Sequence, residues 1–212
     1  MLPTVPDRIV LIDNQDSFSY NLVDALRQLG YPLLVYRNDL SAATIHAQLA
    51  TYAGRQLLCL SPGPATPRDA GCLLELIETV AGQYPLLGIC LGFQALVEHV
   101  GGTIARAPTP VHGRADAMTY QPHPIFAKLP NPLRVARYHS LMGKNLPSSV
   151  IPLAAIDEIP MAVEFPQLQA IGLQFHPESI LTPQGGQLLA QVIQYLFSLA
   201  ATSATRTPSC NS

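Results

Sequence analysis

A cysteine held between small residues is the first feature of this sequence that could do chemistry. The segment Gly88-Ile-Cys-Leu-Gly92 follows an apolar run and has the form of a nucleophile elbow, a tight strand-to-helix turn that exposes its central residue. At a helix N-terminus, the helix dipole and free backbone N–H groups favour the thiolate form of a cysteine. The segment alone leaves two interpretations of Cys90 open, a reactive thiol and a buried structural cysteine.

A histidine and a glutamate that could assist such a thiol stand together near the C-terminus. A cysteine nucleophile needs a base, and the base needs a third group that orients it. Phe175-His-Pro-Glu178 supplies both after the β-type run Ala170 to Gln174, and its proline restrains the backbone so that Glu178 can reach the imidazole of His176. A histidine taken alone is more often structural, and a comparable carboxylate is not evident beside the other five: His46, His99, His112, His123 and His139.

A proline-rich loop offers the third element of this chemistry. Ser61-Pro-Gly-Pro-Ala-Thr-Pro67 is rigid and displays backbone amides, as an oxyanion hole requires when a tetrahedral intermediate gathers charge on oxygen. The same residues would also suit an ordinary proline-rich turn.

Alternating strands and helices must position these residues. Apolar runs and helical periodicity predict four strands and four helices in alternation, which indicates an α/β domain with a doubly wound, mostly parallel central sheet flanked by helices. Ligands of such sheets collect at the carboxyl ends of strands, where the cysteine and the proline-rich loop fall. The expected strands are Arg8–Asp13, Pro32–Tyr36, Gln56–Leu60 and Pro85–Ile89, and the expected helices are Ser17 (as N-cap) to Leu29, Ser41–Leu49, Ala70–Ala81 and Cys90 to Gly101.

The second half of the chain has a different pattern of predicted secondary structure. Thr103 to Gln174 contains short β segments separated by prolines, which predicts an antiparallel β addition to the same domain. Pro183 to Leu199 is expected to close the chain as a helix. We therefore expect a single domain over residues 1–200 and a flexible tail over 201–212, where small and polar residues offer nothing to bury.

The amino-acid composition limits the kinds of ligand and partner that we expect. Charged residues make up 12% of the 212 residues and the formal net charge is −2, so we expect a small ligand and no nucleic acid. A targeting segment or membrane span is not evident, and the cysteines lack the pairing of a metal site or a disulfide framework, which favours a reducing cytoplasm. These cysteines are Cys59, Cys72, Cys90 and Cys210.

Taken together with Gln94, the three motifs resemble the class I, triad-type glutamine amidotransferases over almost the whole chain. Further segments are similar to the glutaminase component of anthranilate synthase. The glutaminase of aminodeoxychorismate synthase is a near relative, and a glutaminase shared by both pathways stays open. The further segments are Ile12-Asp-Asn-Gln-Asp-Ser-Phe18, Tyr20-Asn-Leu-Val-Asp24, Ala136-Arg-Tyr-His-Ser-Leu-Met-Gly-Lys-Asn-Leu-Pro147, Met161-Ala-Val163 and Glu178-Ser-Ile-Leu-Thr182.

The resemblance implies a mechanism and a partner. Cys90 would attack the side-chain amide of L-glutamine, His176 would protonate the departing ammonia and later activate water, and Glu178 would orient His176. Ammonia would pass to a chorismate-using synthase subunit, with no cofactor or metal in this chain and Mg²⁺ in the partner. The implied substrate-binding residues are Ala65 and Leu91, through oxyanion-hole N–H groups, and Gly63, Gln94, Ser140 and Leu141.

Two departures from the family pattern keep other functions open. The family usually has glycine at Ala65, where a positive φ would cost alanine about 1 kcal/mol, and histidine at Phe93, which we expect to act as packing. One alternative is a non-catalytic subunit that stabilises a synthase. Another is a free-standing cysteine hydrolase that acts on γ-glutamyl compounds.

Overall fold

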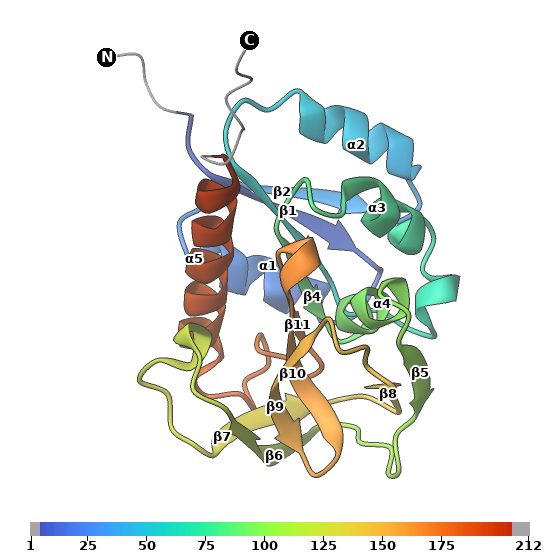
Figure 1. The fold of residues 1–212 in the computed structure, drawn as a ribbon, viewed down its shortest axis with the longest axis vertical. Coiled ribbons are helices and arrows are strands. Elements are labelled where there is room, and N and C mark those ends of the chain that lie inside the picture. Colours follow the sequence, from blue (N-terminus) through green and yellow to red (C-terminus); the bar gives the residue numbers. More distant parts are fainter. Residues whose placement is uncertain (1–4, 205–212) are drawn as a thin grey trace.

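Nine strands form one continuous sheet in the computed structural model, which describes residues 5–204, with side chains described up to residue 200. The strand order is β2-β1-β3-β4-β11-β10-β9-β6-β7, and the first five of these strands run parallel to one another (Figure 1). They are β2 (Leu33–Arg37), β1 (Arg8–Asp13), β3 (Gln56–Leu60), β4 (Leu86–Ile89) and β11 (Ala170–Leu173).

Antiparallel strands extend this sheet on one side. They are β10 (Ile159–Phe165), β9 (Ile151–Ile156), β6 (Arg114–Tyr120) and β7 (Leu133–Arg137). A separate antiparallel pair joins β5 (Thr103–Arg106) to β8 (Leu141–Lys144). The predicted α/β class, with a mostly parallel sheet and an antiparallel β addition, is confirmed.

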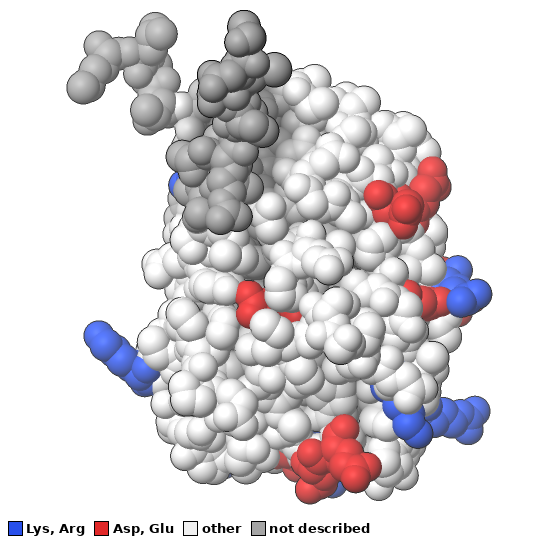
Figure 2. All heavy atoms as spheres, viewed as in Figure 1, with Lys and Arg blue, Asp and Glu red and all other residues white. Residues whose placement is uncertain are grey.

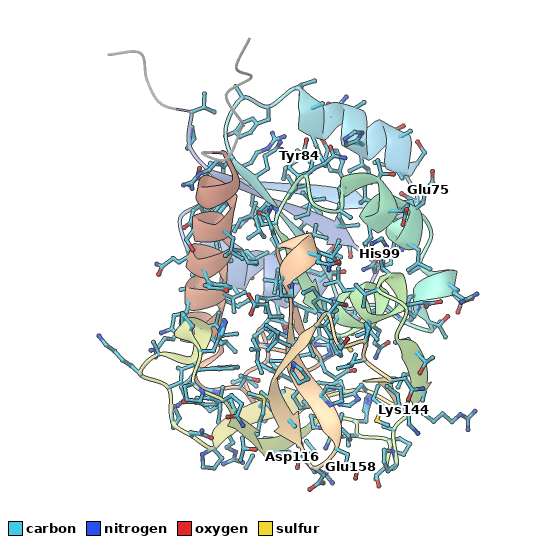
Figure 3. The ribbon with its side chains drawn as sticks, in the orientation of Figure 1. Glu75, Tyr84, His99, Asp116, Lys144 and Glu158 are labelled. Carbon is cyan, nitrogen blue, oxygen red and sulfur yellow. The ribbon has the colours of Figure 1, made fainter. Side chains whose placement is uncertain are left out.

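Helices cover both faces of the parallel strands. Alternate residues of a strand point to opposite faces, so that Ile9 and Leu11 pack on one side of the sheet and Val10 and Ile12 on the other. The first side is covered by α1 (Ser19–Arg27) and α5 (Gly185–Ala204), and the second by α2 (Ala42–Ala50), α3 (Leu73–Val80) and α4 (Leu91–His99). The buried side chains therefore form two apolar layers with the sheet between them, and sticks fill both layers in Figure 3.

Two helix starts differ from the prediction. The N-cap of α1 is Phe18 and not Ser17, because Asp16 accepts the Phe18 N–H at 2.7 Å and delays the first helical turn. The α3 helix begins at Leu73, three residues later than expected. Gly71 has a positive φ of 56° there, since its backbone crosses close to the Asn38 carbonyl.

The other predicted elements lie where the sequence places them. The bounds of β1 and β3 agree residue for residue, and Ser41 caps α2 by accepting the Thr44 N–H at 3.1 Å. The last helix continues to Ala204, into the segment expected as a tail, and residues 205–212 lie outside the described part of the chain.

Charged side chains are sparse on the face shown in Figure 2, where they lie mostly along its edges with neither sign gathered into a broad patch. Within the described residues, no helix is long and apolar enough to cross a membrane.

Candidate active site

Cys90 occupies a strained turn between β4 and α4. Its φ of 50° and ψ of −98° are unusual for a residue with a side chain, as expected of a nucleophile elbow. The Cys90 N–H donates to the Leu173 carbonyl at 2.7 Å, which ties the elbow to the end of the neighbouring strand β11. The residue is 8% exposed, so the sulfur sits just beneath the surface.

Glycines on both sides of the cysteine make this turn possible. A Cβ on Gly88 would lie 2.6 Å from the carbonyl carbon of Gly92, and a Cβ on Gly92 would lie 2.3 Å from the Leu60 carbonyl oxygen. Both distances are far below van der Waals contact. The small residues of the motif are therefore required by the close approach of α4 to β3 and β4.

His176 and Glu178 form a buried pair beside the elbow. The imidazole Nδ1 and the Glu178 Oε1 are 2.7 Å apart, and their side chains are 3% and 0% exposed. Two atoms of this pair, His176 Nε2 and Glu178 Oε2, have no hydrogen bond of normal geometry among the described residues. The Nε2 atom is thus the one left to act on the Cys90 sulfur.

The protonation of His176 reflects its two neighbours. Burial opposes the charged imidazolium, but hydrogen bonding and charge interactions with Cys90 and Glu178 outweigh burial and raise the pKa of His176 to about 10. The sulfur is therefore close enough to influence the ring, as the predicted triad requires. A base of this kind holds its proton at neutral pH and can donate it to a leaving group.

Backbone contacts hold the histidine in place. The His176 N–H donates to the Ala136 carbonyl at 3.0 Å, and the hydroxyl of Thr182 donates to the His176 carbonyl at 2.8 Å. The Phe18 and Tyr138 rings lie 5.1 and 5.2 Å from the imidazole, centroid to centroid. The imidazole is therefore held by backbone contacts on its residue and by two aromatic rings beside it.

The proline-rich loop lies against the first residue of α4. Ala65 has a φ of 59°, a left-handed conformation that glycine adopts more readily. Leu91 is the first residue of α4, so its N–H has no partner within the helix. Gly63 packs against the Leu91 side chain, since an added Cβ would lie 2.4 Å from Leu91 Cδ2. The structure therefore brings the loop and the first turn of α4 into contact.

The remaining predicted residues gather next to the elbow. The Gln94 Nε2 donates to the Leu141 carbonyl at 3.2 Å and to Gln174 Oε1 at 3.3 Å. The Gln174 Nε2 in turn lies 3.8 Å from the Cys90 sulfur. Ser140 precedes Leu141 and is exposed, and its carbonyl accepts the Ala107 N–H at 2.8 Å. Gln94 thus connects the elbow with the 140–141 segment.

His139 supports the Leu141 carbonyl from the other side. Its Nδ1 lies 2.8 Å from that oxygen, and its Nε2 accepts from Arg137 Nε at 3.2 Å. Burial, more than the positive charge of Arg137, lowers the pKa of His139 to about 4 despite its hydrogen bond to Leu141. The neutral ring can therefore donate with one nitrogen and accept with the other.

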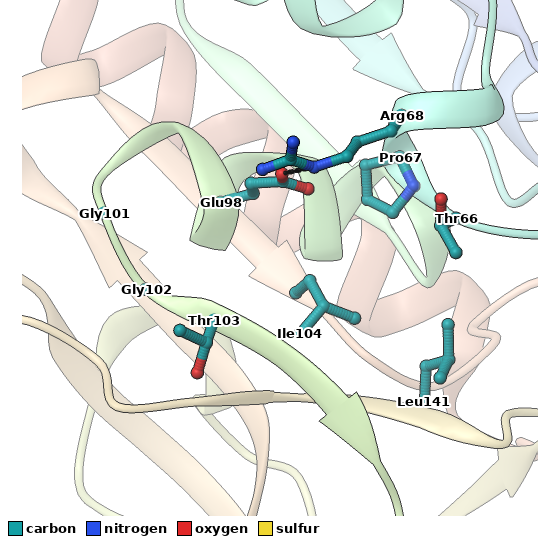
Figure 4. A pocket seen from close by; sticks show the side chains of 9 residues that line it. All are labelled: Thr66, Pro67, Arg68, Glu98, Gly101, Gly102, Thr103, Ile104 and Leu141. Carbon is teal, nitrogen blue, oxygen red and sulfur yellow. Dashed lines mark hydrogen bonds and ion pairs between the residues drawn. The ribbon is translucent and has the colours of Figure 1, made fainter.

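A surface hollow of about 550 Å³ adjoins this segment. Its size is in the range of small-molecule sites. Leu141 and Thr66 line it at one end, and the ion pair of Arg68 with Glu98 lies at its rim (Figure 4). The hollow therefore reaches Leu141, one of the residues that the resemblance assigned to the amino-acid end of glutamine.

Phe93 points away from this chemistry. It is fully buried on α4, its ring centroid is 6.4 Å from that of Phe165, and a Cβ on Gly172 would lie 2.4 Å from its ring. Its environment is therefore apolar packing, as expected.

Sequence reasoning found the thiol, the histidine and the carboxylate but missed several residues around them. The structure adds Gln174, His139 and the aromatic pair Phe18 and Tyr138. Each of these residues lies within one of the sequence motifs or next to one, and the sequence offered no other indication of its role. Within residues 5–204, no three His, Cys, Asp or Glu side chains are grouped as metal ligands.

Comparison with known proteins agrees with this geometry. The family model described as glutamine amidotransferase class-I matches residues 10–195, and this chain belongs to that family. Anthranilate synthase component 2 of Vibrio parahaemolyticus is 46% identical over 187 residues, which are 88% of this chain and 95% of that protein. The pyocyanine-specific anthranilate synthase component 2 of Pseudomonas aeruginosa is 46% identical over 200 residues, which are 94% and 99% of the two chains.

Solved structures share the fold at lower identity. A candidate GMP synthase protein from Thermoplasma acidophilum superposes with a TM-score of 0.80 at 23% identity, covering 94% of this chain and 98% of that one. A glutamine amidotransferase from Thermotoga maritima gives 0.69 at 18% identity, covering 89% and 97%. These likenesses concern the fold alone.

The pKa of His176 predicts a pH-dependent stability. Because the folded-state pKa is about 10 against an ordinary 6.5, the stabilisation from this proton is complete below about pH 6.5 and is lost as the pH rises through 10. The difference in free energy of unfolding between the wild type and His176→Gln should shrink over that range in urea denaturation. A constant difference would contradict the assignment.

The strained alanine predicts a stabilising substitution. Ala65→Gly should raise the free energy of unfolding by up to about 1 kcal/mol, because glycine adopts a positive φ without steric penalty. Thermal and urea unfolding measure this change. The exposed helical residue Ala47 provides a control, since Ala47→Gly in α2 should lower stability by about 1 kcal/mol. A loss of stability in Ala65→Gly would show that the loop tolerates alanine without strain.

The packing role of Phe93 predicts that histidine brings no catalytic benefit there. Phe93→His should lower the free energy of unfolding by about 1 to 3 kcal/mol, because it buries an imidazole without a partner. Ammonia release from glutamine by the assembled complex should not increase. A gain of about a hundredfold, the scale of one acid–base group, would show instead that the wild-type site is impaired.

Proposed function

We propose that this chain is the glutamine amidotransferase subunit of an anthranilate synthase. It hydrolyses L-glutamine to glutamate and ammonia, and a chorismate-using synthase subunit consumes the ammonia. The observation that carries this proposal is the convergence of Cys90, His176 and Glu178 beyond the ends of the adjacent parallel strands β4 and β11. The names of the similar relatives favour anthranilate synthase over aminodeoxychorismate synthase.

The chemistry begins at the sulfur. Cys90 Sγ attacks the side-chain amide carbon of glutamine, and the carbonyl oxygen becomes negatively charged. The N–H groups of Ala65 and Leu91 face this oxygen as the oxyanion hole. His176 Nε2 gives its proton to the amide nitrogen, the C–N bond breaks, and ammonia leaves behind a γ-glutamyl thioester.

Hydrolysis then restores the thiol. The neutral His176 takes a proton from a water molecule, the resulting hydroxide attacks the thioester, and the C–S bond breaks to release glutamate. Glu178, bonded to Nδ1 at 2.7 Å, holds the ring so that Nε2 faces the sulfur in both steps.

The substrate's amino-acid end is assigned to the other side of the elbow. Gln94 and the backbone of Ser140 and Leu141 would bind its charged groups, with Gly63 next to the oxyanion loop. Support for this comes from the Gln94 hydrogen bond to the Leu141 carbonyl and from the hollow that opens at Leu141. We propose that this chain uses no cofactor and that Mg²⁺ binds to the synthase subunit. We expect the complex to be in the cytoplasm.

A non-catalytic stabilising subunit is the alternative from another class. This alternative was suggested by Ala65 and Phe93, the two positions that differ from the usual family residues. Ala65 nevertheless adopts the left-handed conformation natural to glycine, and Phe93 is fully buried in apolar packing against Phe165. Both observations support a working glutaminase. A free-standing hydrolase would turn over glutamine at full rate without a partner, whereas a gated glutaminase would not.

The decisive test removes the nucleophile. Cys90→Ser in the complex with its synthase should abolish anthranilate formation from chorismate and glutamine, because serine is a far weaker nucleophile at neutral pH. Synthesis from added ammonium salt should be unchanged. The matched control is Cys72→Ser, another free and largely buried cysteine, at the N-cap of α3, which should keep both activities. Loss of both activities in Cys90→Ser alone would refute the role assigned to Cys90.

A further inference from the structure

A buried asparagine anchors the loop that carries the oxyanion-hole amide. Asn14 follows β1, Ser61 follows β3, and they are 2% and 0% exposed. The Asn14 N–H donates to Ser61 Oγ and its Nδ2 donates to the Ser61 carbonyl, each at 2.8 Å. The Ser61 hydroxyl donates to the Pro62 carbonyl at 2.7 Å. One asparagine thus holds both the side chain and the main chain of the first loop residue.

Asn14 also contacts the middle of the loop. A Cβ on Gly63 would lie 2.7 Å from Asn14 Cβ on one side and 2.4 Å from Leu91 Cδ2 on the other. Gly63 is therefore enclosed between Asn14 and the first residue of α4. Because Leu91 follows the nucleophile directly, this contact sets how far the loop stands from the elbow.

A second anchor holds the far side of Ala65. The Thr66 N–H and hydroxyl donate to Asp69 Oδ2 at 3.2 and 2.6 Å, so the loop is fixed immediately after the alanine. Ala65 keeps its left-handed φ between these two anchors. A peptide constrained on both sides cannot rotate freely, and a change at either anchor would turn its N–H.

We propose that Asn14 is a positioning residue for the oxyanion hole, which aims the Ala65 N–H at the substrate carbonyl oxygen by holding Ser61 and Gly63. The proposal rests on the glutaminase function assigned above. Asn14 contacts the loop at Ser61 and Gly63, so its effect on the reaction passes through the loop.

An amide is required at this position. Nδ2 donates to a carbonyl, while Oδ1 accepts from Asn38 Nδ2 at 3.3 Å. The substitution Asn14→Asp keeps the shape but places an acceptor against the Ser61 carbonyl oxygen, which exchanges a hydrogen bond for a repulsion. Gln56→Glu is the matched control, because Gln56 is a buried amide at the other end of β3 whose Nε2 donates to the Leu49 carbonyl at 2.8 Å, away from Asn14 and the loop.

The experiment compares two reactions of the same sulfur in the complex with its synthase. Ammonia release from glutamine develops charge on oxygen, whereas alkylation of Cys90 by iodoacetamide does not. Asn14→Asp should lower kcat for glutamine by about tenfold to a hundredfold, part of the effect of losing one oxyanion donor. KM for glutamine should stay within about threefold, since ground-state binding is untouched. The alkylation rate and ammonia-dependent anthranilate synthesis should match the wild type, and Gln56→Glu should match it in every assay.

Ser61→Ala serves as a milder second variant. It removes the hydroxyl that accepts from the Asn14 N–H but keeps the bond to the Ser61 carbonyl, so a smaller fall in kcat with unchanged alkylation is expected. The inference is overturned by a kcat within about threefold of wild type in both variants, by parallel slowing of alkylation, or by an equal fall in Gln56→Glu. If the proposed function itself failed, the wild-type complex would make product from ammonia but not from glutamine, and this inference would fall with it.

Discussion

The Cys90 N–H bond to the Leu173 carbonyl is the contact on which the rest of the site depends. It joins two strands that lie far apart in the sequence, since β4 and β11 pair in parallel with Ile89 opposite Leu173. Parallel strands end at the same edge of a sheet, so whatever follows each strand must meet there. The thiol follows one strand by a single residue and the imidazole follows the other by three, which brings them together without any long flexible segment.

The strain in this arrangement is concentrated in two short turns. Cys90 and Ala65 both hold positive φ angles. Cys90 is buried, whereas Ala65 is exposed between Gly63 and Thr66, which are both held by contacts. Gly88 and Gly92 allow α4 to press onto the sheet, while Gly63 allows the proline-rich loop to press onto α4. Strained conformations of this kind persist only where the surrounding packing over-determines them. The apolar layers beside the sheet supply that packing at Cys90, and the contacts of Gly63 and Thr66 supply it at Ala65.

Local patterns carried most of what could be predicted. Apolar runs gave the strands of the first half, and turn residues gave the elbow, because both depend on neighbours in the sequence. The N-cap of α1 was misplaced, since the Asp16 carboxylate competes for the Phe18 N–H. The contacts of Asn14 with Ser61 and of Gln174 with Cys90 could not be predicted at all. They join segments 47 and 84 residues apart, and only the order of the strands in the sheet brings these segments together.

The buried carboxylate of Glu178 is one reason why the pKa of His176 is raised. A carboxylate whose side chain is fully buried is costly unless a positive charge compensates it, and the imidazolium is the group that lies against it. The pair therefore retains the proton. Yet Nε2 and Oε2 lack partners within the described residues, whereas buried polar atoms are nearly always paired. The site thus holds a proton on Nε2, beside the sulfur but without a hydrogen bond of normal geometry, and the amide nitrogen of a bound glutamine is the group that would accept it.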